Sequence, residues 1–243
     1  MKQILVEGHR GFCSKYPENT LLSFEAALEL GVDAIEFDVW LTQDKIPVLM
    51  HDGNAIRTCG VNRHLRDMTL SEVKTLQPIY REKFGDTYAD QGITVPTLEE
   101  LLQLCAQKAP HIILGVEIKE YTEENVDLTV ALLKKYNFFD TCYFYAFNAR
   151  ILKYIKTRYN GRTMGYPDFQ MKEYEQDSYR YYDEIGLSMA IVKSEIAPIY
   201  LKKGLPIHMY CADTKEDVAL CIKNGASLIT ANDPTELLKV LDK

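Results

Sequence analysis

The chain has 243 residues, 47% of them hydrophobic and 26% charged, and these values are typical of one globular domain with a sizeable core. The formal net charge of −7 at pH 7 argues against a nucleic-acid backbone or an anionic membrane as the main partner. A small anionic substrate is compatible with this charge, because it meets the local field of its pocket.

Short apolar runs alternate with amphipathic segments along most of the chain. In chain order, we expect strands at residues 4–8, 34–41, 112–118, 142–147, 163–166, 189–193, 207–211 and 227–230. We expect helices at residues 21–30, 98–108, 123–136, 149–158, 195–203, 215–224 and 234–241. Strands that alternate with helices indicate right-handed βαβ units and a parallel sheet. Eight strands in about 240 residues favour an α/β fold of the closed (β/α)8 TIM-barrel type over an open doubly wound sheet.

The alternation of strands and helices stops after His51 and resumes near Val95. Residues 53–95 contain a polar segment, one short predicted helix at residues 71–76, and an irregular piece rich in Tyr, Gly and Asp. A departure of this length on the loop side of a barrel usually shapes the active site. We therefore predict one TIM-barrel domain, residues 1–243, with an insertion subdomain at residues 53–95 that walls the site. The alternative is a covering subdomain without a catalytic role.

Three carboxylates are predicted to point into the barrel. Glu36 and Asp38 share one face of the second strand, and the apolar residues between them must face the helices. By the same alternation, Glu117 and Lys119 share the inward face of the next strand. Unpaired buried carboxylates cost several kcal/mol, and an oxygen-rich cage of this kind suits one divalent cation, Mg²⁺ or Ca²⁺. The alternative is an internal salt-bridge network of the three carboxylates with Arg10 and Lys119.

Two histidines follow apolar runs, which places them at the C-terminal rim of a barrel, where such enzymes keep their chemistry. His9 and His51 could supply one base and one acid near neutral pH. The alternative for each is a surface or capping histidine. The remaining histidines, His64, His111 and His208, are interpreted as structural.

Two cations are candidates for contacts with phosphate oxygens. Arg10 offers a guanidinium fork and Lys119 an ammonium point charge. Asn19, at the start of the first helix, is either its N-cap or a site residue.

The compartment follows from the N-terminus and the cysteines. Residues 1–7 lack the long apolar core of a signal peptide, and no run approaches the roughly 18 apolar residues of a membrane span. The six cysteines are scattered and form no CxxC pair, which is typical of reduced thiols. We therefore expect a cytoplasmic protein. The sequence does not indicate an oligomeric state.

Taken together, the motifs resemble the glycerophosphodiester phosphodiesterase family. The motifs that carry the resemblance are His9-Arg10-Gly11, Glu18-Asn19-Thr20, Glu36-Phe37-Asp38-Val39 with Thr42 and Asp44, His51-Asp52, Val95-Pro96-Thr97-Leu98 and Glu117-Ile118-Lys119. The resemblance implies a TIM barrel with a small insertion after the second strand. It also implies hydrolysis of glycerophosphodiesters to glycerol 3-phosphate and an alcohol with a divalent cation.

By motif match, the resemblance assigns Glu36, Asp38 and Glu117 as metal ligands. His9 and His51 would be the acid/base pair, and Arg10 and Lys119 would contact phosphate. The implied partner is a small glycerophosphodiester, and the nucleophile is either water or the substrate's own glycerol hydroxyl.

Two rival functions and one departure from the family pattern accompany this reading. The rivals are a phospholipase D-like enzyme that acts on lysophospholipids or sphingolipids, and a non-catalytic barrel that binds phosphodiesters. Family members often carry a tryptophan-threonine pair on the seventh strand, where this chain reads Met209-Tyr210-Cys211. Tyr210 could replace the apolar wall of the pocket.

Overall fold

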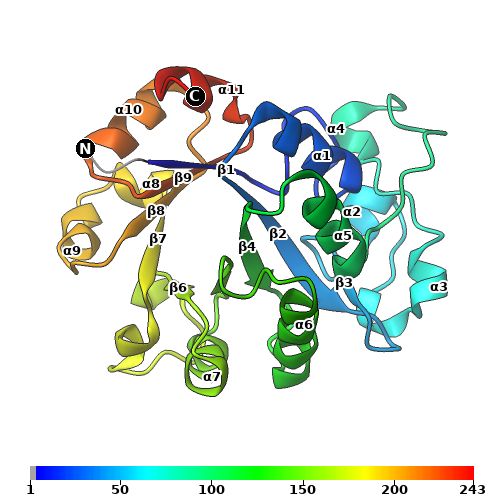
Figure 1. Cartoon of the computed structure of the whole chain (residues 1–243), viewed down its shortest axis with the longest axis horizontal. Coiled ribbons are helices and arrows are strands. Elements are labelled where there is room, and N and C mark those ends of the chain that lie inside the picture. Colours follow the sequence, from blue (N-terminus) through cyan, green and yellow to red (C-terminus); the bar gives the residue numbers. More distant parts are fainter. Residues whose placement is uncertain (1–3) are drawn as a thin grey trace.

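The computed structural model describes residues 4–243 and forms a closed barrel surrounded by helices (Figure 1). Within these residues, eight strands run parallel in the order β1-β9-β8-β7-β6-β5-β4-β2, and pairing of β1 with β2 closes the ring. A ninth strand, β3, pairs antiparallel with β2 outside the ring. The strands are β1 Leu5–Gly8, β2 Ala34–Leu41, β3 Pro47–Leu49, β4 Ile113–Ile118, β5 Tyr143–Tyr145, β6 Thr163–Gly165, β7 Glu184–Ser188, β8 Ile207–Tyr210 and β9 Leu228–Ala231. The predicted TIM barrel is thus confirmed.

Helices follow most of the parallel strands and cover the outside of the barrel. The helices are α1 Leu21–Leu30, α2 Ile56–Cys59, α3 Leu70–Val73, α4 Arg81–Phe84, α5 Leu98–Lys108, α6 Glu123–Lys135, α7 Ala149–Tyr159, α8 Met189–Val192, α9 Ala197–Leu201, α10 Lys215–Lys223 and α11 Pro234–Val240. Single 3₁₀ turns span Leu65–Asp67, Asp168–Gln170 and Ser178–Tyr181. Local sequence fixes several starts, since Thr97 forms a capping box with Glu100, and Thr69 with Glu72. None of the helices within residues 4–243 is long and apolar enough to cross a membrane.

One predicted strand is wrong. Residues 189–193 form the short helix α8, and the seventh parallel strand is the preceding segment, β7. A short apolar run such as Met189-Ala190-Ile191-Val192 has no period that separates a buried strand from a helix. Here the Ser188 side chain accepts a hydrogen bond from the Ile191 amide and starts a helix.

The seventh parallel strand, β7, begins with a charged residue. For this reason the search for apolar runs did not predict a strand there. Glu184 is 4% exposed and has two polar partners: Arg162 Nε donates to it at 2.6 Å, and His208 Nε2 lies 2.6 Å away. These partners come from β8 and from the segment before β6, so only the closed barrel makes Glu184 acceptable inside.

Alternation along β2 separates apolar from polar side chains, as the sequence predicted. Ile35, Phe37 and Val39 are fully buried in the core between the strands and the outer helices. Phe37 packs edge-on against Phe24 of α1 with ring centroids 6.2 Å apart. Burial of one such side chain is worth about 1.5–3 kcal/mol. This packing fixes the register that turns Glu36 inward.

A polar layer lies inside the barrel below the rim. Glu7 of β1 is 1% exposed and accepts hydrogen bonds from the Tyr143 hydroxyl and the Thr230 hydroxyl, each at 2.7 Å. Burial raises the pKa of Glu7 above its ordinary value. Gly115 of β4 leaves room for this layer, because a Cβ there would meet Tyr143 Oη at 2.6 Å and Glu7 Oε1 at 2.8 Å.

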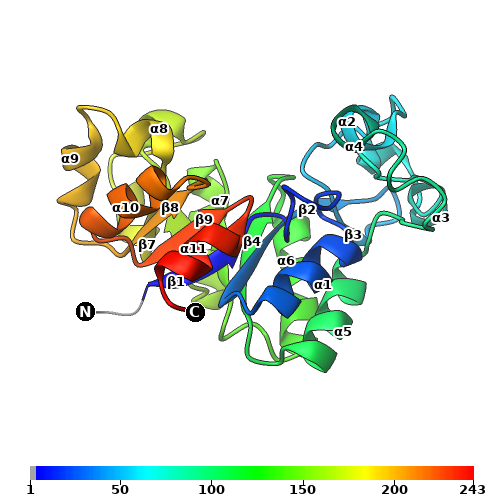
Figure 2. The ribbon, with the colours of Figure 1, turned by 90° about the horizontal axis from the view of Figure 1, so that it is seen from above.

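Residues 53–95 leave the barrel rhythm, as expected, and contain α2, α3 and α4. Figure 2 shows these helices gathered at one end of the molecule and α8 and α9 at the other. The segment has its own small apolar cluster, which includes Leu65, Met68 and Leu76. Val48 of β3 belongs to the same cluster. The helix predicted at residues 71–76 is shorter and ends at Val73. Whether this segment behaves as a separate subdomain stays a prediction. The part of the signal-peptide prediction that concerns residues 1–3 lies outside the described residues.

Candidate active site

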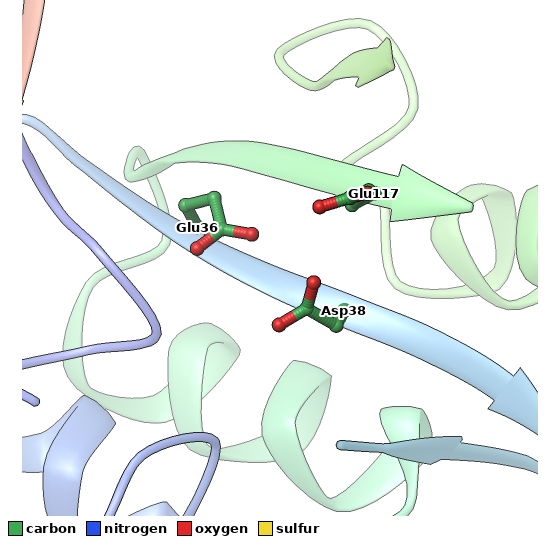
Figure 3. Close-up of side chains that lie close together, drawn as sticks. All are labelled: Glu36, Asp38 and Glu117. Carbon is green, nitrogen blue, oxygen red and sulfur yellow. The ribbon is translucent and has the colours of Figure 1, made fainter. Parts of the chain in front are cut away.

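Three acidic side chains from two neighbouring strands lie close together (Figure 3). Glu36 and Asp38 come from β2 and Glu117 from β4, and the register sets Asp38 beside Glu117. One carboxylate oxygen from each lies within 4.8 Å of the other two. The residues are only 2%, 0% and 5% exposed, respectively. The inward carboxylates predicted from strand alternation are therefore brought together.

The electrostatics of this cluster differ from residue to residue. Burial raises the pKa of Glu36 well above its ordinary value, and the neighbouring charge of Asp38 raises it further. Burial and the charge of Asp38 likewise raise the pKa of Glu117 to about 8. Burial acts on Asp38 too, but the charges of Lys119 and Arg10 outweigh it and lower the pKa of that carboxyl. Asp38 is thus the anionic centre of the cluster.

The donor set fits a hard divalent cation. Three carboxylates face only two nearby cations, since Lys119 Nζ lies 3.0 Å from Glu117 Oε1 and 3.6 Å from Asp38 Oδ1, and Arg10 Nε lies 3.4 Å from Asp38 Oδ2. Asp38 Oδ1 is buried and accepts no hydrogen bond. The ion pairs of the alternative interpretation therefore exist, but they leave the buried oxygen Asp38 Oδ1 without a hydrogen bond. An oxygen-ligated cation would satisfy it.

His9 follows β1 and is held by a side chain from the far end of the chain. Its Nδ1 lies 2.7 Å from Asn232 Oδ1, and Asn232 Nδ2 in turn donates to Asp213 at 2.6 Å. Because an amide oxygen only accepts, His9 carries its proton on Nδ1 and presents a free Nε2, which lies 3.8 Å from Glu36 Oε2. Burial and the charge of Arg10 lower the pKa of His9 to about 4, so the ring is neutral at pH 7.

His51 sits on the segment after β3 and is held differently. Its Nδ1 lies 2.7 Å from Asp52 Oδ1, and its backbone carbonyl accepts a 3.3 Å hydrogen bond from Trp40 Nε1. Burial lowers the pKa of His51, while Asp38 and the hydrogen bond to Asp52 oppose that shift. The two histidines therefore differ in partner: a neutral amide for His9 and a carboxylate for His51.

The predicted phosphate contacts also lie at the rim. The Arg10 amide donates to Glu36 at 2.9 Å, and its guanidinium donates to Glu18 at 2.9 Å. Asn19 is not the N-cap of α1, because Thr20 accepts the hydrogen bond from the Ser23 amide. Asn19 instead has φ 55° and donates to Asp38 Oδ2 at 2.8 Å. It therefore orients the most acidic member of the carboxylate cluster.

A cavity of about 230 Å³ opens above the carboxylates. Its polar side contains His9, Arg10, Glu36, His51, Glu117 and Lys119. The opposite side, here called the aromatic wall, consists of Tyr145, Phe147, Tyr166 and Tyr210. Phe147 and Tyr166 stack with centroids 4.1 Å apart, and Tyr166 meets Tyr210 edge-on at 5.7 Å. Tyr210 thus lines the pocket, as its position on the atypical strand suggested.

Sequence reasoning missed several contacts of the site. Tyr145 of β5 donates to Glu36 at 2.5 Å, Asn232 accepts from His9, and Arg57 donates to Asp52, the partner of His51. The alternation of Tyr143 and Tyr145 on one strand face was the available signal for the tyrosine. Asn232 has none, because its contact joins residues 223 positions apart.

The three histidines that were interpreted as structural do not line the cavity rim. His64 packs edge-on against Trp40 with centroids 5.2 Å apart and accepts a hydrogen bond from the Arg66 amide. His208 lies deeper, at the floor of the cavity, and pairs with Glu184. His111 lies beside a separate surface depression next to the start of β4.

Comparison with known proteins shows which family the chain belongs to. A sequence model of the glycerophosphoryl diester phosphodiesterase family matches residues 9–236. A glycerophosphodiester phosphodiesterase of Caldanaerobacter subterraneus subsp. tengcongensis is 30% identical over 256 residues, and the alignment covers 98% of each chain.

Solved structures share the fold. A phosphodiesterase of Oleispira antarctica in complex with the product sn-glycerol-3-phosphate has a TM-score of 0.85 at 22% identity, with 98% of this chain and 97% of that chain covered. A glycerophosphodiester phosphodiesterase of Parabacteroides distasonis has a TM-score of 0.79 at 22% identity, with 99% and 98% covered. These solved structures therefore share the barrel over almost all of this chain. The family sequence model covers residues that line both sides of the cavity. The chain belongs to the glycerophosphoryl diester phosphodiesterase family, and it is an enzyme of that family, as the sequence predicted.

Proposed function

We propose that this protein hydrolyses glycerophosphodiesters to glycerol 3-phosphate and an alcohol with the help of one divalent cation, Mg²⁺ or Ca²⁺. The observation that carries the proposal is the carboxylate cluster of Glu36, Asp38 and Glu117 at a cavity that His9 and His51 also line. The relative from Caldanaerobacter, which is similar to this chain over nearly its full length, is named for this activity.

Glu36, Asp38 and Glu117 would hold the cation. When bound, it would polarise a phosphoryl oxygen and neutralise charge that develops during the reaction. Arg10 and Lys119 line the same cavity and would bind the remaining phosphate oxygens, Arg10 through its fork and Lys119 as a point charge. Asn19 keeps Asp38 in place by its hydrogen bond.

The partners of the two histidines support different proposed roles for them. His9 is neutral and presents Nε2 as an acceptor, so it takes the proton of the attacking hydroxyl. His51 is paired with the Asp52 carboxylate, which stabilises an imidazolium, so it donates a proton to the leaving alkoxide. The base therefore has a neutral neighbour and the acid an anionic one.

Two nucleophiles are compatible with this arrangement, water and the glycerol hydroxyl next to the ester. We favour the hydroxyl, because it is already tethered near the phosphorus and needs little ordering. Its attack would expel the alcohol and form a cyclic phosphate, which water then opens with the histidine roles reversed.

A release assay tests the function. The protein is incubated with glycerophosphodiesters of choline, ethanolamine, glycerol and inositol, with Mg²⁺, Ca²⁺ or Mn²⁺ or after exhaustive chelation. We expect metal-dependent release of glycerol 3-phosphate, poor cleavage of bis(p-nitrophenyl) phosphate, which lacks a neighbouring hydroxyl, and almost none of a monoester.

The same panel separates the rivals. Faster turnover of lysophosphatidylcholine or sphingomyelin than of any glycerophosphodiester would favour the phospholipase D-like function. Tight binding of glycerophosphodiesters without any turnover would favour a non-catalytic barrel. Full activity after chelation would refute the proposed cation.

A further inference from the structure

Arg57 lies in helix α2 of the 53–95 segment. It is not one of the proposed catalytic, metal-binding or phosphate-binding residues. Its guanidinium spans two carboxylates from different parts of the chain. Nε donates to Asp52 at 2.5 Å, while the two terminal nitrogens donate to the two oxygens of Glu18 at 2.9 and 2.7 Å. The plane of the guanidinium also lies over the Tyr80 ring, 5.0 Å from its centroid.

Each of the two carboxylates also contacts a residue of the candidate site. Asp52 is the hydrogen-bond partner of His51. Glu18 lies in the loop between β1 and α1, and one of its oxygens also accepts from Arg10. Arg57 thus joins the segment that bears His51 to the barrel rim that bears Arg10.

Burial makes this junction stronger than a surface ion pair. The Glu18 side chain is 8% exposed and that of Arg57 26%, so water screens their contact only in part. Charged pairs with two parallel hydrogen bonds are the strong and directional ones. Asp52 is 34% exposed, so without Arg57 only its bond to His51 would hold it in place.

We propose that Arg57 is a positioning residue for the proton transfer by His51: it anchors Asp52 to Glu18, and Asp52 in turn holds the His51 ring with Nε2 toward the cavity. The inference rests on the proposed role of His51. The segment 53–95 then contributes to the reaction through the Arg57 side chain, although none of its residues lines the cavity. Lysine cannot replace Arg57, because an ammonium group cannot bridge Asp52 and both oxygens of Glu18.

The test compares Arg57→Gln, Arg57→Lys and the matched control Arg63→Gln. Arg63 lies in the same segment and pairs with Glu72, but it contacts none of the site residues. We expect kcat to fall about 10–100-fold for both Arg57 variants, the usual cost of losing a residue that orients a ligand or base, with a smaller change in KM. Arg63→Gln should leave kcat unchanged.

Two further measurements separate positioning from a general loss of stability. Millimolar guanidinium should restore part of the kcat of Arg57→Ala, since it can occupy the space between Asp52 and Glu18, and thermal unfolding recorded in parallel shows whether each variant is folded. Fluorescence of Trp40, the single tryptophan of the chain, which donates to the His51 carbonyl, should change in Arg57→Gln and return toward the wild-type signal in Arg57→Ala with guanidinium. If Arg57→Gln fails to fold, Arg57→Lys and the guanidinium rescue decide the question.

The His51→Ala background distinguishes the two proposals. Arg57→Gln should add little to the loss already caused by His51→Ala, because residues that act as one unit are not additive. An equal cost in both backgrounds, a rise in KM at unchanged kcat, or an effect as small as that of Arg63→Gln would overturn the role of Arg57. Full activity of His51→Ala itself would refute the proposed function, and the inference would fall with it.

Discussion

The two arcs of the barrel contribute different parts of the cavity. Strands β1, β2 and β4, adjacent in the ring, carry or lead into His9, Glu36, Asp38 and Glu117. Strands β5, β6 and β8, on the other arc, end in the aromatic wall. One arc thus concentrates charge and the other excludes water and gives shape. A low-dielectric wall strengthens the electrostatic interactions that face it.

One residue of the aromatic wall also contacts the carboxylate cluster on the other arc. Tyr145 belongs to the aromatic wall, yet its hydroxyl donates to Glu36. Its ring contacts Tyr166 edge-on with centroids 5.9 Å apart. The comparison therefore makes a distinction that can be tested: changes on the charged arc should affect the cation and the proton transfers, and changes on the aromatic wall should affect the fit of the substrate.

The largest effect is expected from the carboxylate cluster. Chelation should abolish turnover, and Glu36→Gln should lower kcat about 10³-fold or more, because a bound cation supplies several kcal/mol and each ~1.4 kcal/mol is a factor of ten. Calorimetric titration with Mn²⁺ should show weaker binding in Glu36→Gln. Activity that survives both treatments would remove the proposed role of the charged arc.

The second-largest effect on kcat is expected from loss of the His9 side chain. His9→Ala should lower kcat about 10²–10⁴-fold, the usual size of a general acid–base contribution. His64→Ala is the control, since His64 packs against Trp40 away from the cavity. Equal losses in the two variants, measured at saturating substrate, would show that the assignment of His9 is wrong.

Cation affinity should depend on pH in a defined direction. The raised pKa of Glu117, about 8, means that this carboxyl of the metal-free cluster is mostly protonated at pH 7. A cation must displace that proton, so affinity should rise by about tenfold per pH unit from pH 6 toward 8 and level off above. Titrations across this range check the slope, and Glu117→Gln should flatten it. A wild-type affinity independent of pH would contradict this shift.

The variant Tyr145→Phe tests the residue of the aromatic wall that also contacts the carboxylate cluster. Loss of its hydrogen bond to Glu36 should weaken Mn²⁺ binding about 10-fold, at the lower end of the cost of losing a ligand's hydrogen-bond partner. The apolar ring remains, so KM for the preferred substrate should change little once metal is saturating. A change in KM without a change in metal affinity would place Tyr145 functionally with the aromatic wall alone.

The smallest effect is expected at the mouth of the aromatic wall. Tyr210→Leu removes an edge-on contact with Tyr166, which is worth about 0.5–1.5 kcal/mol. We expect kcat/KM to fall about 2–10-fold, unequally across the alcohol groups of the panel. Metal affinity should be unchanged, as in the control Tyr159→Leu on the outer helix α7. An equal effect on every substrate would show that this position does not select the alcohol.

The candidate site was predictable from sequence wherever strand alternation decides orientation. Glu36 and Asp38 had to point inward because Ile35, Phe37 and Val39 had to face the helices. His9 was placed at the rim because parallel strands end there together. His51 also lines the cavity, but it follows β3, which runs antiparallel to β2 outside the ring. The seventh strand was not predictable, since its first residue, Glu184, is tolerated inside only through Arg162 and His208.

The sequence by itself determined the alternation of strands and helices except at the seventh strand, the inward set of three carboxylates, and the break in this alternation after His51. These follow from local periodicity, which depends on neighbouring residues alone. Only the tertiary structure decided which residues hold the histidines: Asn232 for His9, and Asp52 with Arg57 for His51. The His9–Asn232 contact joins residues 223 positions apart that meet only in the closed ring, and Arg57 also reaches back 39 positions to Glu18. Their geometry depends on barrel closure and on the packing of the 53–95 segment, which no local pattern records.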